Sequence, residues 1–510
     1  MHIICLAYLS FFLRRNMKAR SQYHIQPWHF LRKSNNVMLF GLFMVVVSLE
    51  VTKSGYLVKT LPGFPGDLPF LFETGYISVG KNDDVQYFYY FFESERSPEN
   101  DPLLLWVRGG PGCGVLTSIL LQIGPITINY INSSLENQML ELSTHSLTKV
   151  ANILFLDEPA GSGFSYAKSP EGYITNDTLT PIHIHQFIRK WLVDHSKFVK
   201  NPLYLGGDSY GGISVPMTIQ EIYNGNEGGE EPHINFKGYI LGNPLTDKHD
   251  SSNAKIEQVH RMALISDKIY ESVKQNCHGE YQYVDPNNNR CIQDLQVVHE
   301  CIERISVDNI LYPFCDRSNT SKSEHLRIGL RSLDKTSIYI WSSDDVQTQW
   351  LCNYKSAYIE AWASRRDVKE ALHVSEELNE IKWVSCNQSL TYADGLLAKV
   401  SYKFNIMSTV AYHQEFSHKN CRALVYSGDH DLRVPHFSTL KWIESINLLL
   451  VEYWRPWYVD EQVAGYTMKF SNHDYKLTFA TVKGGSHTSP ENRPEECFNM
   501  FIRWFDSVDL

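Results

Sequence analysis

Six short apolar runs, each ending in a glycine or acidic turn, constrain the fold of this 510-residue chain more than any other feature. They are Leu103–Val107, Ile153–Leu156, Leu203–Leu205, Tyr239–Leu241, Ala423–Tyr426 and Leu477–Val482. Continuous apolar runs are typical of strands buried on both faces, as in parallel sheets covered by helices. Amphipathic stretches such as Ile184–Val193 and Ser214–Tyr223 lie between them. This alternation predicts an α/β fold with a mostly parallel central sheet and helices on both faces.

The composition argues against two classes of protein. Hydrophobic residues make up 43% of the chain and charged residues 20%, the balance of a globular protein rather than a disordered one. The 47 Lys and Arg residues against 57 Asp and Glu residues give a formal net charge of −10. A nucleic-acid binder needs a basic face, so we expect no nucleic-acid partner.

Residues 1–54 form an N-terminal extension with the features of a secretory signal. Val37–Leu49 is an apolar run of thirteen residues shortly after the basic residues Arg32 and Lys33. At ~1.5 Å per residue a helix of this length spans about 20 Å, short of a ~30 Å hydrocarbon core. A basic flank before a short apolar core is typical of a secretory signal. A buried helix is the alternative interpretation.

A second apolar stretch, Ile3–Leu13, precedes this run, which is unusual for a signal. Either translation starts at Met17 or Met38, or the segment stays in place as an anchor. We therefore expect contact with a membrane only if the apolar segment is not cleaved.

Sequons and cysteines agree with passage through the secretory pathway. Four N-x-[ST] sequons occur, at Asn132, Asn176, Asn319 and Asn387. Of the ten cysteines, nine lie beyond the extension, and no CxxC or Cys/His metal spacing is present, which favours disulfides. Nine is odd, so at least one thiol is free or pairs outside the chain. We expect a secreted or vacuolar protein without a metal or cofactor.

The middle of the chain differs from its two ends. Residues 251–350 are polar and rich in cysteine, which indicates an insertion or cap between a first core part, 55–250, and a second, 351–510. Within the insertion, residues 316–335 have the composition of a solvated linker open to proteases. Residues 224–231 have the composition of a surface loop.

The segment Gly207–Gly211 has the spacing G-x-S-x-G that is typical of a nucleophile elbow. In such an elbow a strand turns sharply into a helix, so we expect no room for bulk on either side of Ser209. An apolar run precedes the motif and a helical stretch begins near Ile213, which is the required context. A plain glycine turn is the alternative, but this setting favours Ser209 as a nucleophile.

A serine hydroxyl needs a base, and the base needs an acid that orients it. In this type of fold the acid and then the histidine follow the serine along the chain. Asp431 and His487 each follow one of the apolar runs, where the carboxyl end of a strand leads into a loop. Asp429 and His430 are the rival candidates, and we expect Asp429 only to cap the turn.

Acyl chemistry also needs an oxyanion hole, which backbone N–H groups supply well. One donor is expected from Tyr210, the residue after the nucleophile. The glycine-rich loop Gly109–Cys113 follows an early apolar run and is placed to supply the other. It does not fit a phosphate loop, because no Lys-[ST] follows.

Four motifs in order resemble the serine carboxypeptidase family. They are WVRGGPGCG (106–114), GGDSYGG (206–212), YSGDHD (426–431) and KGGSHTSP (483–490). The resemblance spans about residues 60–508 and implies an α/β-hydrolase fold with a cap insertion. It implies Ser209, Asp431 and His487 as a catalytic triad, and the N–H groups of Gly110 and Tyr210 as the oxyanion hole.

Three further segments, 61–76, 454–467 and 479–487, resemble the plant branch of this family. Many members of that branch move a hydroxycinnamoyl or similar acyl group from a glucose ester to an alcohol or amine. Peptidase members instead bind the carboxylate of a peptide with an Asn and a Glu at the positions of Arg108 and Asp208. Arg108 could bind a carboxylate bidentately or be neutralised by Asp208, and we favour the ion pair.

The resemblance also implies the disulfides Cys113–Cys352, Cys277–Cys291 and Cys301–Cys315. Some members are cut within the insertion into two disulfide-linked chains, so we expect a monomer or such a processed pair, with 316–335 lost.

Three functions remain open. The first is an acyltransferase that acts on a small-molecule acyl ester and an acceptor. The second is a carboxypeptidase that acts on peptides. The third is an inactive binding glycoprotein, against which the complete set of catalytic residues argues.

Overall fold

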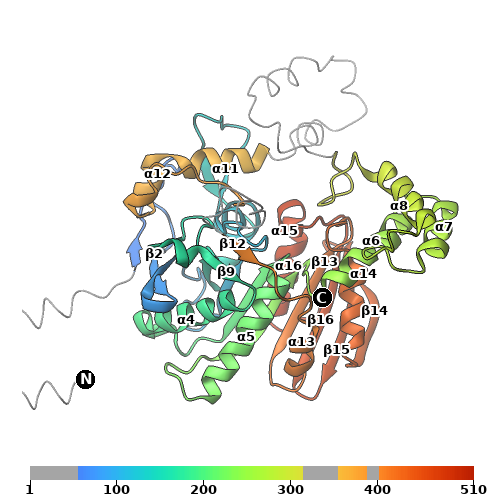
Figure 1. Cartoon of the computed structure of the whole chain (residues 1–510). Helices are drawn as coiled ribbons and strands as arrows, with labels where there is room; N and C mark the ends of the chain where they lie inside the picture. Colours follow the sequence, from blue (N-terminus) through green and yellow to red (C-terminus); the bar gives the residue numbers. More distant parts are fainter. Residues whose placement is uncertain (1–54, 314–353, 388–400) are drawn as a thin grey trace, which may run out of the picture. The chain divides into compact units, whose positions relative to one another are not determined.

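The computed structural model describes residues 55–313, 354–387 and 401–510. Within these ranges a twelve-stranded sheet has the order β1-β2-β3-β7-β4-β10-β11-β13-β16-β15-β14, with β8 paired to β3 (Figure 1). The strands are β1 (Gly55–Leu57), β2 (Phe72–Val79), β3 (Val85–Phe92), β4 (Leu103–Val107), β7 (Asn152–Leu156), β8 (Tyr166–Ala167), β10 (Leu203–Asp208), β11 (Phe236–Gly242), β13 (Arg422–Gly428), β14 (Leu449–Val459), β15 (Gln462–Asn472) and β16 (Tyr475–Val482). Two small sheets pair β5 (Ile126–Ile128) with β6 (Leu140–Leu142) and β9 (Ile174–Asn176) with β12 (Ser401–Lys403).

Helices connect most of these strands. They are α3 (Leu116–Ser118), α4 (Leu179–Asp194), α5 (Gly211–Glu227), α6 (Lys248–Arg261), α7 (Asp267–Cys277), α8 (Asn289–Ile302), α11 (Tyr354–Ser364), α12 (Arg366–Ala371), α13 (Val410–Phe416), α14 (His436–Ser445), α15 (Ser489–Asn492) and α16 (Pro494–Phe505). No helix in the described ranges is both long enough and apolar enough to cross a bilayer.

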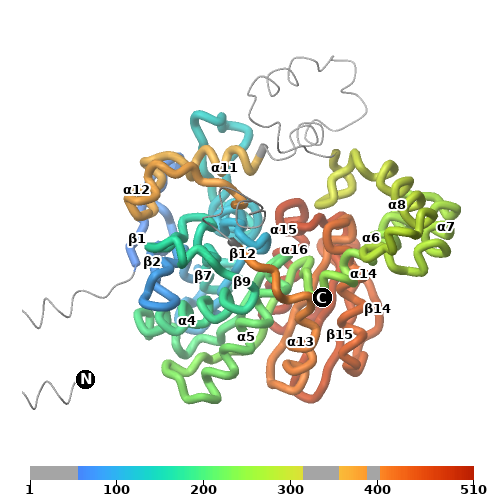
Figure 2. The backbone as a smooth tube through the Cα atoms, in the orientation of Figure 1, coloured from blue at the N-terminus to red at the C-terminus, as the bar shows by residue number. Residues whose placement is uncertain are grey.

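The centre of the sheet is parallel and its margins are antiparallel. β7, β4, β10, β11, β13 and β16 run in one direction, while β3 and β15 pair with this group in the other. Figure 2 shows β14 and β15, both from the last part of the chain, lying together, and β16 and β13 follow them in the strand order. The six apolar runs of the sequence all lie in the parallel group, so the predicted parallel sheet is confirmed.

Both faces of the sheet are covered, as the unbroken apolar runs predict. Along β4, Leu104 and Trp106 pack into one core, while Leu103, Leu105 and Val107 pack into the other. Side chains of α11 and α16 fill the first core, and side chains of α4, α5 and α14 fill the second. Alternate side chains of a strand point to opposite faces, so a strand between two helix layers must be apolar throughout.

The helix α5 is longer than the sequence indicates, because it continues to Glu227. The first half of the predicted loop 224–231 is therefore helical. A Cβ on Gly225 would lie 2.6 Å from the Arg189 guanidinium of α4. Glycine at this position thus lets the last turns of α5 pack closely against α4.

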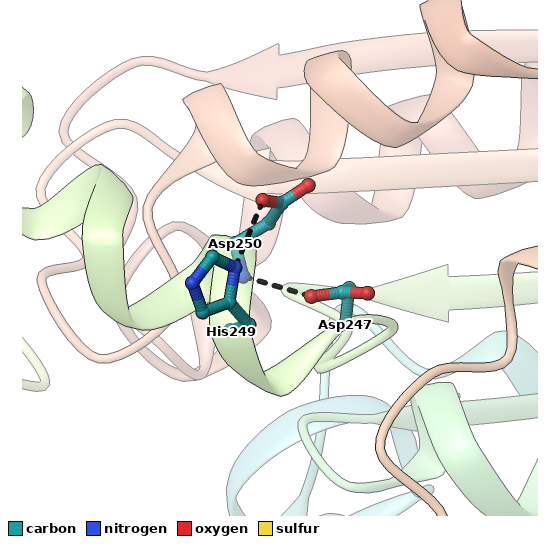
Figure 3. Close-up of side chains that lie close together, drawn as sticks. All are labelled: Asp247, His249 and Asp250. Atoms are coloured by element: carbon teal, nitrogen blue, oxygen red, sulfur yellow. Dashed lines mark hydrogen bonds and ion pairs between the residues drawn. The ribbon is translucent and has the colours of Figure 1, made fainter. Parts of the chain in front are cut away.

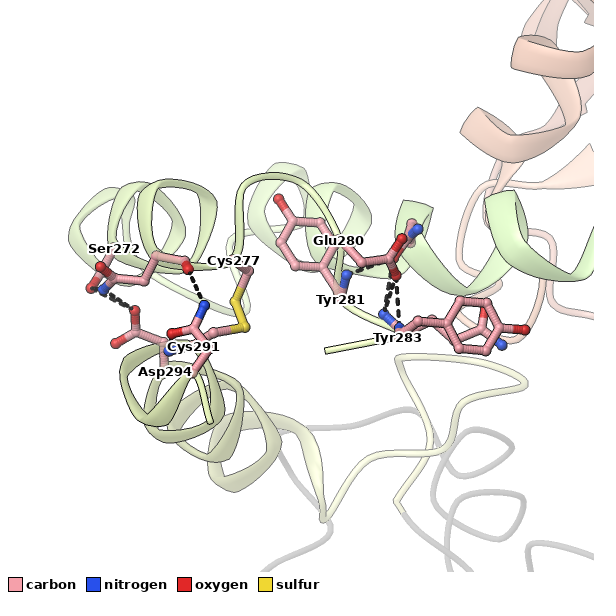
Figure 4. The surroundings of a disulfide bond; sticks show 11 residues. Ser272, Cys277, Glu280, Tyr281, Tyr283, Cys291 and Asp294 are labelled. Atoms are coloured by element: carbon pink, nitrogen blue, oxygen red, sulfur yellow. Dashed lines mark hydrogen bonds between the residues drawn. A yellow bond between two sulfur atoms is a disulfide. The ribbon is translucent and has the colours of Figure 1, made fainter. Parts of the chain in front are cut away.

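Three helices, α6, α7 and α8, follow β11 and lie outside the sheet (Figure 1). They share a small apolar core that includes Val259, Val273 and Val298. The disulfide Cys277–Cys291 joins α7 to α8, as the family resemblance implies (Figure 4). It closes a loop of 14 residues, which stabilises a fold by about 3 kcal/mol in the chain-entropy model.

Several sequence predictions fall on residues that the structure does not describe. They concern the extension 1–54, the linker 316–335, the sequon at Asn319, and the cysteines Cys315 and Cys352.

Candidate active site

Ser209 lies at the sharp turn between β10, which ends at Asp208, and α5, which begins at Gly211. Its φ of 54° is in the left-handed region, where a non-glycine residue is strained and must be held by its surroundings. Its N–H donates to the Gly242 carbonyl at 2.9 Å, and its carbonyl accepts the Leu245 N–H at 2.8 Å. The end of β11 and the loop after it therefore hold the strained turn.

The turn at Ser209 has no room for a side chain at two glycines, and only one of them belongs to the G-x-S-x-G motif. A Cβ on Gly207 would lie 3.0 Å from the Val107 carbonyl oxygen, and one on Gly212 would lie 2.8 Å from the Leu245 backbone. A Cβ on Gly211 would meet nothing within 4 Å. The expectation that both motif glycines are sterically required is thus wrong for Gly211, because the close approach falls one residue later.

His487 connects the serine to the acid. Its Nε2 lies 2.8 Å from Ser209 Oγ, and its Nδ1 lies 2.8 Å from Asp431 Oδ2. The three side chains come from the loops after β10, β13 and β16, whose carboxyl ends meet at one edge of the parallel sheet. The structure therefore brings together the three residues that the sequence singled out.

Asp431 is fully buried, and neighbouring donors hold its carboxylate in place. Asn243 Nδ2 donates to Oδ2 at 2.8 Å, and the N–H groups of Arg433 and Val434 donate to Oδ1 at 2.7 and 3.3 Å. A buried carboxylate that accepts several hydrogen bonds stays in one orientation. Asp431 is therefore able to orient His487 and to stabilise its protonated form.

The charges around His487 set its proton affinity. Burial is the largest influence and favours the neutral ring, but the charge and hydrogen bond of Asp431 outweigh it. Asp308 adds to the effect of Asp431 and Arg433 opposes it, and the net result raises the pKa of His487 above its ordinary value. A base in this setting accepts a proton from Ser209 readily.

The loop after β4 faces the nucleophile with free donors. Within the described residues, neither the N–H of Gly110 nor that of Tyr210 donates to a protein acceptor. A Cβ on Gly109 would lie 2.6 Å from Ser209 Cβ, so the loop passes directly against the elbow. Gly110 has a φ of 143°, which favours glycine. Both N–H groups are thus available to a substrate oxyanion.

Known proteins resemble this chain along most of its length. A sequence profile described as serine carboxypeptidase matches residues 62–507. The chain belongs to the serine carboxypeptidase family. Serine carboxypeptidase-like 10 of Arabidopsis thaliana is 42% identical over 470 residues, which cover 92% of this chain and 98% of that protein. Serine carboxypeptidase-like 19 of the same plant is 41% identical over 482 residues, or 94% of this chain and all of that protein.

Among solved structures, the family fold is found in a prohormone-processing carboxypeptidase, Kex1, from Saccharomyces cerevisiae. The two structures superpose with a TM-score of 0.66 at 18% identity, covering 89% of this chain and 97% of that one. The similarity confirms the α/β-hydrolase fold, and the chain is an enzyme of the serine carboxypeptidase-like type.

One family-derived disulfide differs from the expectation. The loop Gly109–Cys113 is here called the oxyanion loop after its expected role. Its Cys113 pairs with Cys386, 273 residues away, and not with Cys352. The neighbouring backbones run side by side, since Gly114 N–H donates to the Ser385 carbonyl at 3.0 Å and Asn387 N–H donates to the Gly112 carbonyl at 2.8 Å. This pairing brings Cys386 to Cys113 and anchors the loop.

The remaining described cysteines carry free thiols. Cys301 has a free thiol on the surface, so the expected Cys301–Cys315 pair is not formed at Cys301. Cys421 and Cys497 are buried.

The expected ion pair between Arg108 and Asp208 is absent from the described residues. Asp208 Oδ1 accepts the Gly109 N–H at 3.1 Å, and Oδ2 accepts a hydrogen bond from Gln122 at 3.2 Å. Both oxygens are thus engaged by the oxyanion loop and its neighbour. In the described structure, Arg108 Nη1 is buried and has no hydrogen-bond partner.

Three residues that support the site were missed in the sequence. Asn243 follows the strand β11, and its position at a strand end was a signal that could have identified it. Asp177, next to the sequon residue Asn176, accepts the Tyr210 hydroxyl at 2.5 Å. Asp308 comes from the insertion, and its carbonyl accepts the His487 N–H at 2.7 Å. No local pattern marks Asp177 or Asp308.

The rival residues have other roles. Asp429 Oδ1 accepts the Gly484 N–H at 2.6 Å, so it supports the turn that precedes His487. The N–H of His430 donates to the Gly485 carbonyl at 2.9 Å in the same turn.

A cluster of Asp247, His249 and Asp250 at the start of α6 has the ligand types of a cation site (Figure 3). Each side chain has a structural partner. Asp247 accepts the Asp250 N–H at 2.8 Å as the helix cap, and His249 Nε2 lies 2.6 Å from Glu280. Asp250 pairs with Lys441 at 2.7 Å. The cluster is accounted for as the cap of α6 and its ion pairs.

The sequons within the described residues differ in accessibility. Asn132 is exposed. Asn176 is half-buried, and its Oδ1 accepts the N–H groups of Thr178 and Leu179 at 2.9 and 2.8 Å. Asn387 is half-buried, and its Nδ2 donates to the Gly161 carbonyl at 2.8 Å. Asn132 is therefore the most accessible of the three to a glycan.

Proposed function

We propose that this enzyme transfers an acyl group from a glucose ester to an alcohol or amine through an acyl-enzyme on Ser209. The observation that carries the proposal is the chain of hydrogen bonds from Asp431 through His487 to Ser209, with 2.8 Å at each step. A serine hydroxyl becomes an effective nucleophile when a base in hydrogen-bond contact takes its proton.

In the first half-reaction Ser209 Oγ attacks the ester carbonyl and His487 Nε2 takes the hydroxyl proton. The carbonyl oxygen gains a negative charge, which the N–H groups of Gly110 and Tyr210 stabilise. The C–O bond to glucose then breaks, and His487 returns the proton to the departing sugar oxygen. An ester between the acyl group and Ser209 remains.

In the second half-reaction the acceptor hydroxyl or amine attacks the acyl-enzyme. His487 takes the acceptor proton and then returns it to Ser209 Oγ as the acyl–enzyme bond breaks. Water in place of the acceptor would give hydrolysis, so transfer requires an acceptor that excludes water from the acyl carbon.

Two observations support transfer over peptide hydrolysis. The segments 61–76, 454–467 and 479–487 resemble the plant branch, in which acyltransferases are common, and two relatives at 42% and 41% identity are plant proteins. Asp208 also differs from the Glu with which peptidase members bind a substrate carboxylate. Both Asp208 oxygens already accept hydrogen bonds from Gly109 and Gln122.

A carboxypeptidase is the second candidate, and Arg108 favours it. Its buried Nη1 lacks a hydrogen-bond partner in the described structure, and it lies two residues before Gly110. A substrate carboxylate would pair with the guanidinium and satisfy this atom. Arg108 would then replace the Asn of peptidase members.

A paired assay on the purified glycoprotein separates the two activities. One reaction contains a blocked dipeptide with a free carboxylate, and the other a hydroxycinnamoyl glucose ester with mixed alcohol and amine acceptors. Ser209→Ala and Arg108→Gln are measured beside the wild type. Acyl transfer that is lost in Ser209→Ala and kept in Arg108→Gln supports the transferase.

Dipeptide cleavage that depends on both Ser209 and Arg108 would overturn the transferase and establish the peptidase. The inactive glycoprotein is tested with a fluorophosphonate, which labels an activated serine. Labelling of the wild type and not of Ser209→Ala would exclude that third function.

We also propose that the enzyme travels the secretory pathway to the vacuole or the cell exterior. The two disulfides and the accessible sequon at Asn132 support an oxidising compartment. Enzymatic deglycosylation should lower the apparent mass of the native protein, and Asn132→Gln should remove part of that change. Processing within 316–335 predicts two fragments on a reducing gel, and a single intact band would contradict it.

A further inference from the structure

The last described part of the insertion returns to the catalytic residues. Ile305 and Pro313 form an isolated β-bridge, and Ser306 N–H donates to the Tyr312 carbonyl at 2.8 Å. These contacts turn the chain back on itself and present residues 307–310, here called the insertion tip. The tip is separated from Asp431 and His487 by more than a hundred residues of sequence.

The insertion tip is hydrogen-bonded to both loops that carry the acid and the base. Leu432 N–H donates to the Val307 carbonyl at 2.9 Å, and Ile310 N–H donates to the His430 carbonyl at 3.1 Å. These two bonds bracket Asp431. The N–H of His487 donates to the Asp308 carbonyl at 2.7 Å. The tip thus connects the loop after β13 to the loop after β16.

The Asp308 side chain adds a charged contact to this connection. Its carboxylate forms an ion pair with the Arg433 guanidinium. The backbone N–H of Arg433 in turn donates to Asp431 Oδ1 at 2.7 Å. Asp308 therefore contacts His487 through its backbone carbonyl. Through its carboxylate it contacts Arg433, the residue whose N–H donates to Asp431.

We propose that Asp308 is a positioning residue for His487, supplied by the insertion, which aligns the histidine with Asp431 and balances the charge of its protonated ring. The inference rests on the proposed function, because it assumes that His487 is the base for Ser209. It makes the insertion a part of the catalytic machinery and not only a cover over it.

Other charged groups share this neighbourhood and limit the size of the effect. Asp431 faces His487 directly, and Arg433 lies beside Asp431 and Asp308. The charges of Arg433 and Asp431 also act on Lys255 of α6. Asp429 and His430 lie in the adjoining turn, where Arg493 also acts on Asp429. The Asp308 and Arg433 side chains are 39% and 46% exposed, so water and salt screen their charges.

The experiment measures the rate of Ser209 labelling by a fluorophosphonate between pH 4 and pH 9. This rate rises with the fraction of His487 that is neutral, because only the neutral ring can accept the Ser209 proton. The measurement needs no natural substrate. Asp308→Asn keeps the backbone carbonyl and removes the charge, so its profile should move to lower pH by about 0.2 to 0.7 unit. Arg433→Gln removes a cation that opposes protonation, so its profile should move to higher pH.

Two controls isolate the charge. Asp308→Glu restores the carboxylate and should return the profile toward that of the wild type. Glu257→Gln removes an exposed carboxylate of the same insertion, paired with Arg261, and should leave the profile unchanged. In 1 M salt the wild type and Asp308→Asn should converge.

The outcomes distinguish this inference from the proposed function. A wild type that is not labelled at Ser209 would overturn the proposed function. Labelled proteins whose profiles coincide for the wild type, Asp308→Asn and Arg433→Gln would overturn the inference alone. If Asp308→Asn does not fold, the direction of the Arg433→Gln shift decides, and a shift to lower pH would contradict the proposal.

Discussion

At the scale of single residues, the site depends on groups that hold the reacting side chains in strained or charged states. Ser209 has a positive φ, and Asp431 is a fully buried carboxylate. Each such state costs free energy and persists only where neighbours stabilise it. Asn243 donates to Asp431, and the residue before it, Gly242, accepts the Ser209 N–H.

Removal of the Asn243 amide should weaken catalysis more than folding. Asn243→Ala deletes a hydrogen bond to a charged group, worth about 1.5–3 kcal/mol, which corresponds to roughly a 10- to 100-fold lower labelling rate at Ser209. Asn243→Asp keeps the shape but places a second carboxylate beside Asp431, and it should lower the rate at least as much. Rates within twofold of the wild type in both variants would contradict this role.

The two glycines after the nucleophile form a matched pair. Gly211→Ala places a methyl group in open space at the start of α5, so activity should persist and stability should rise by up to about 1 kcal/mol. Gly212→Ala places the methyl group against the Leu245 backbone and should destabilise the elbow. Urea unfolding and fluorophosphonate labelling of the two variants test this. Equal effects would show that the elbow does not require the close approach of Gly212 to Leu245.

At the scale of secondary-structure elements, Asp177 connects segments that are distant in the sequence. It follows β9, and its Oδ2 accepts the N–H groups of Asn405 and Ile406, each at 2.8 Å, beyond β12. Its Oδ1 accepts the Tyr210 hydroxyl, to which Lys248 of α6 also donates, at 3.1 Å. The small β9–β12 sheet thus fixes the side chain of the residue whose N–H is proposed for the oxyanion hole.

Asp177→Asn should therefore affect both stability and catalysis. The amide can no longer accept on both sides, so buried donors lose their partner at a cost of about 1–3 kcal/mol. Loss of the hydrogen bond to the Tyr210 hydroxyl should let Tyr210 shift, and its N–H, the proposed oxyanion donor, would shift with it. We therefore expect a lower kcat with a smaller change in KM. The exposed Asp194→Asn serves as control. A variant with reduced stability and an unchanged kcat would limit Asp177 to a structural role.

At the scale of the whole molecule, two adjacent buried acids couple folding to pH. Burial raises the pKa of Asp157 to about 7, against hydrogen bonds from the Phe164 and Val115 N–H groups. Burial and the charge of Asp157 raise the pKa of Glu158 to about 8. Both lie in the segment after β7, in the parallel part of the sheet.

These shifts predict that the two acids stabilise the folded protein more in acid than at neutral pH. From the ordinary values of 3.8 and 4.5 up to about 7 and 8, the folded protein keeps protons that the unfolded chain releases. The stability that the two acids contribute therefore falls as pH rises through this window. Burial lowers the pKa of His413 to about 3 and that of His436 to about 4, which has the opposite effect on stability below about pH 6.5. The melting temperature should therefore decrease from pH 6.5 to pH 8, and Glu158→Gln should reduce the decrease. The exposed Glu171→Gln is the control, and equal slopes in all three proteins would contradict the assignment.

The central strands and the candidate site could be predicted because both depend on short sequence patterns, the apolar runs and the residues that follow them. An unbroken apolar run has one stable environment, between two helix layers, and each of the six runs lies there. The carboxyl ends of parallel strands meet at one edge, so residues after those strands converge without any long-range information. Ser209, Asp431 and His487 each follow such a strand.

The sequence did not reveal contacts between segments that are far apart in the chain and become neighbours only when it folds. The pairing of Cys113 with Cys386 depends on which backbone runs beside the oxyanion loop, and the two cysteines are 273 residues apart. Arg108 lost its expected partner because Gly109 and Gln122 occupy Asp208. Chain-local patterns thus predicted the parallel strands and singled out Ser209, Asp431 and His487 in that order along the chain. Tertiary packing decided the disulfide, the support from Asp177 and the contact of Asp308 with His487, because hydrogen bonds and ion pairs form only between groups that folding brings within reach.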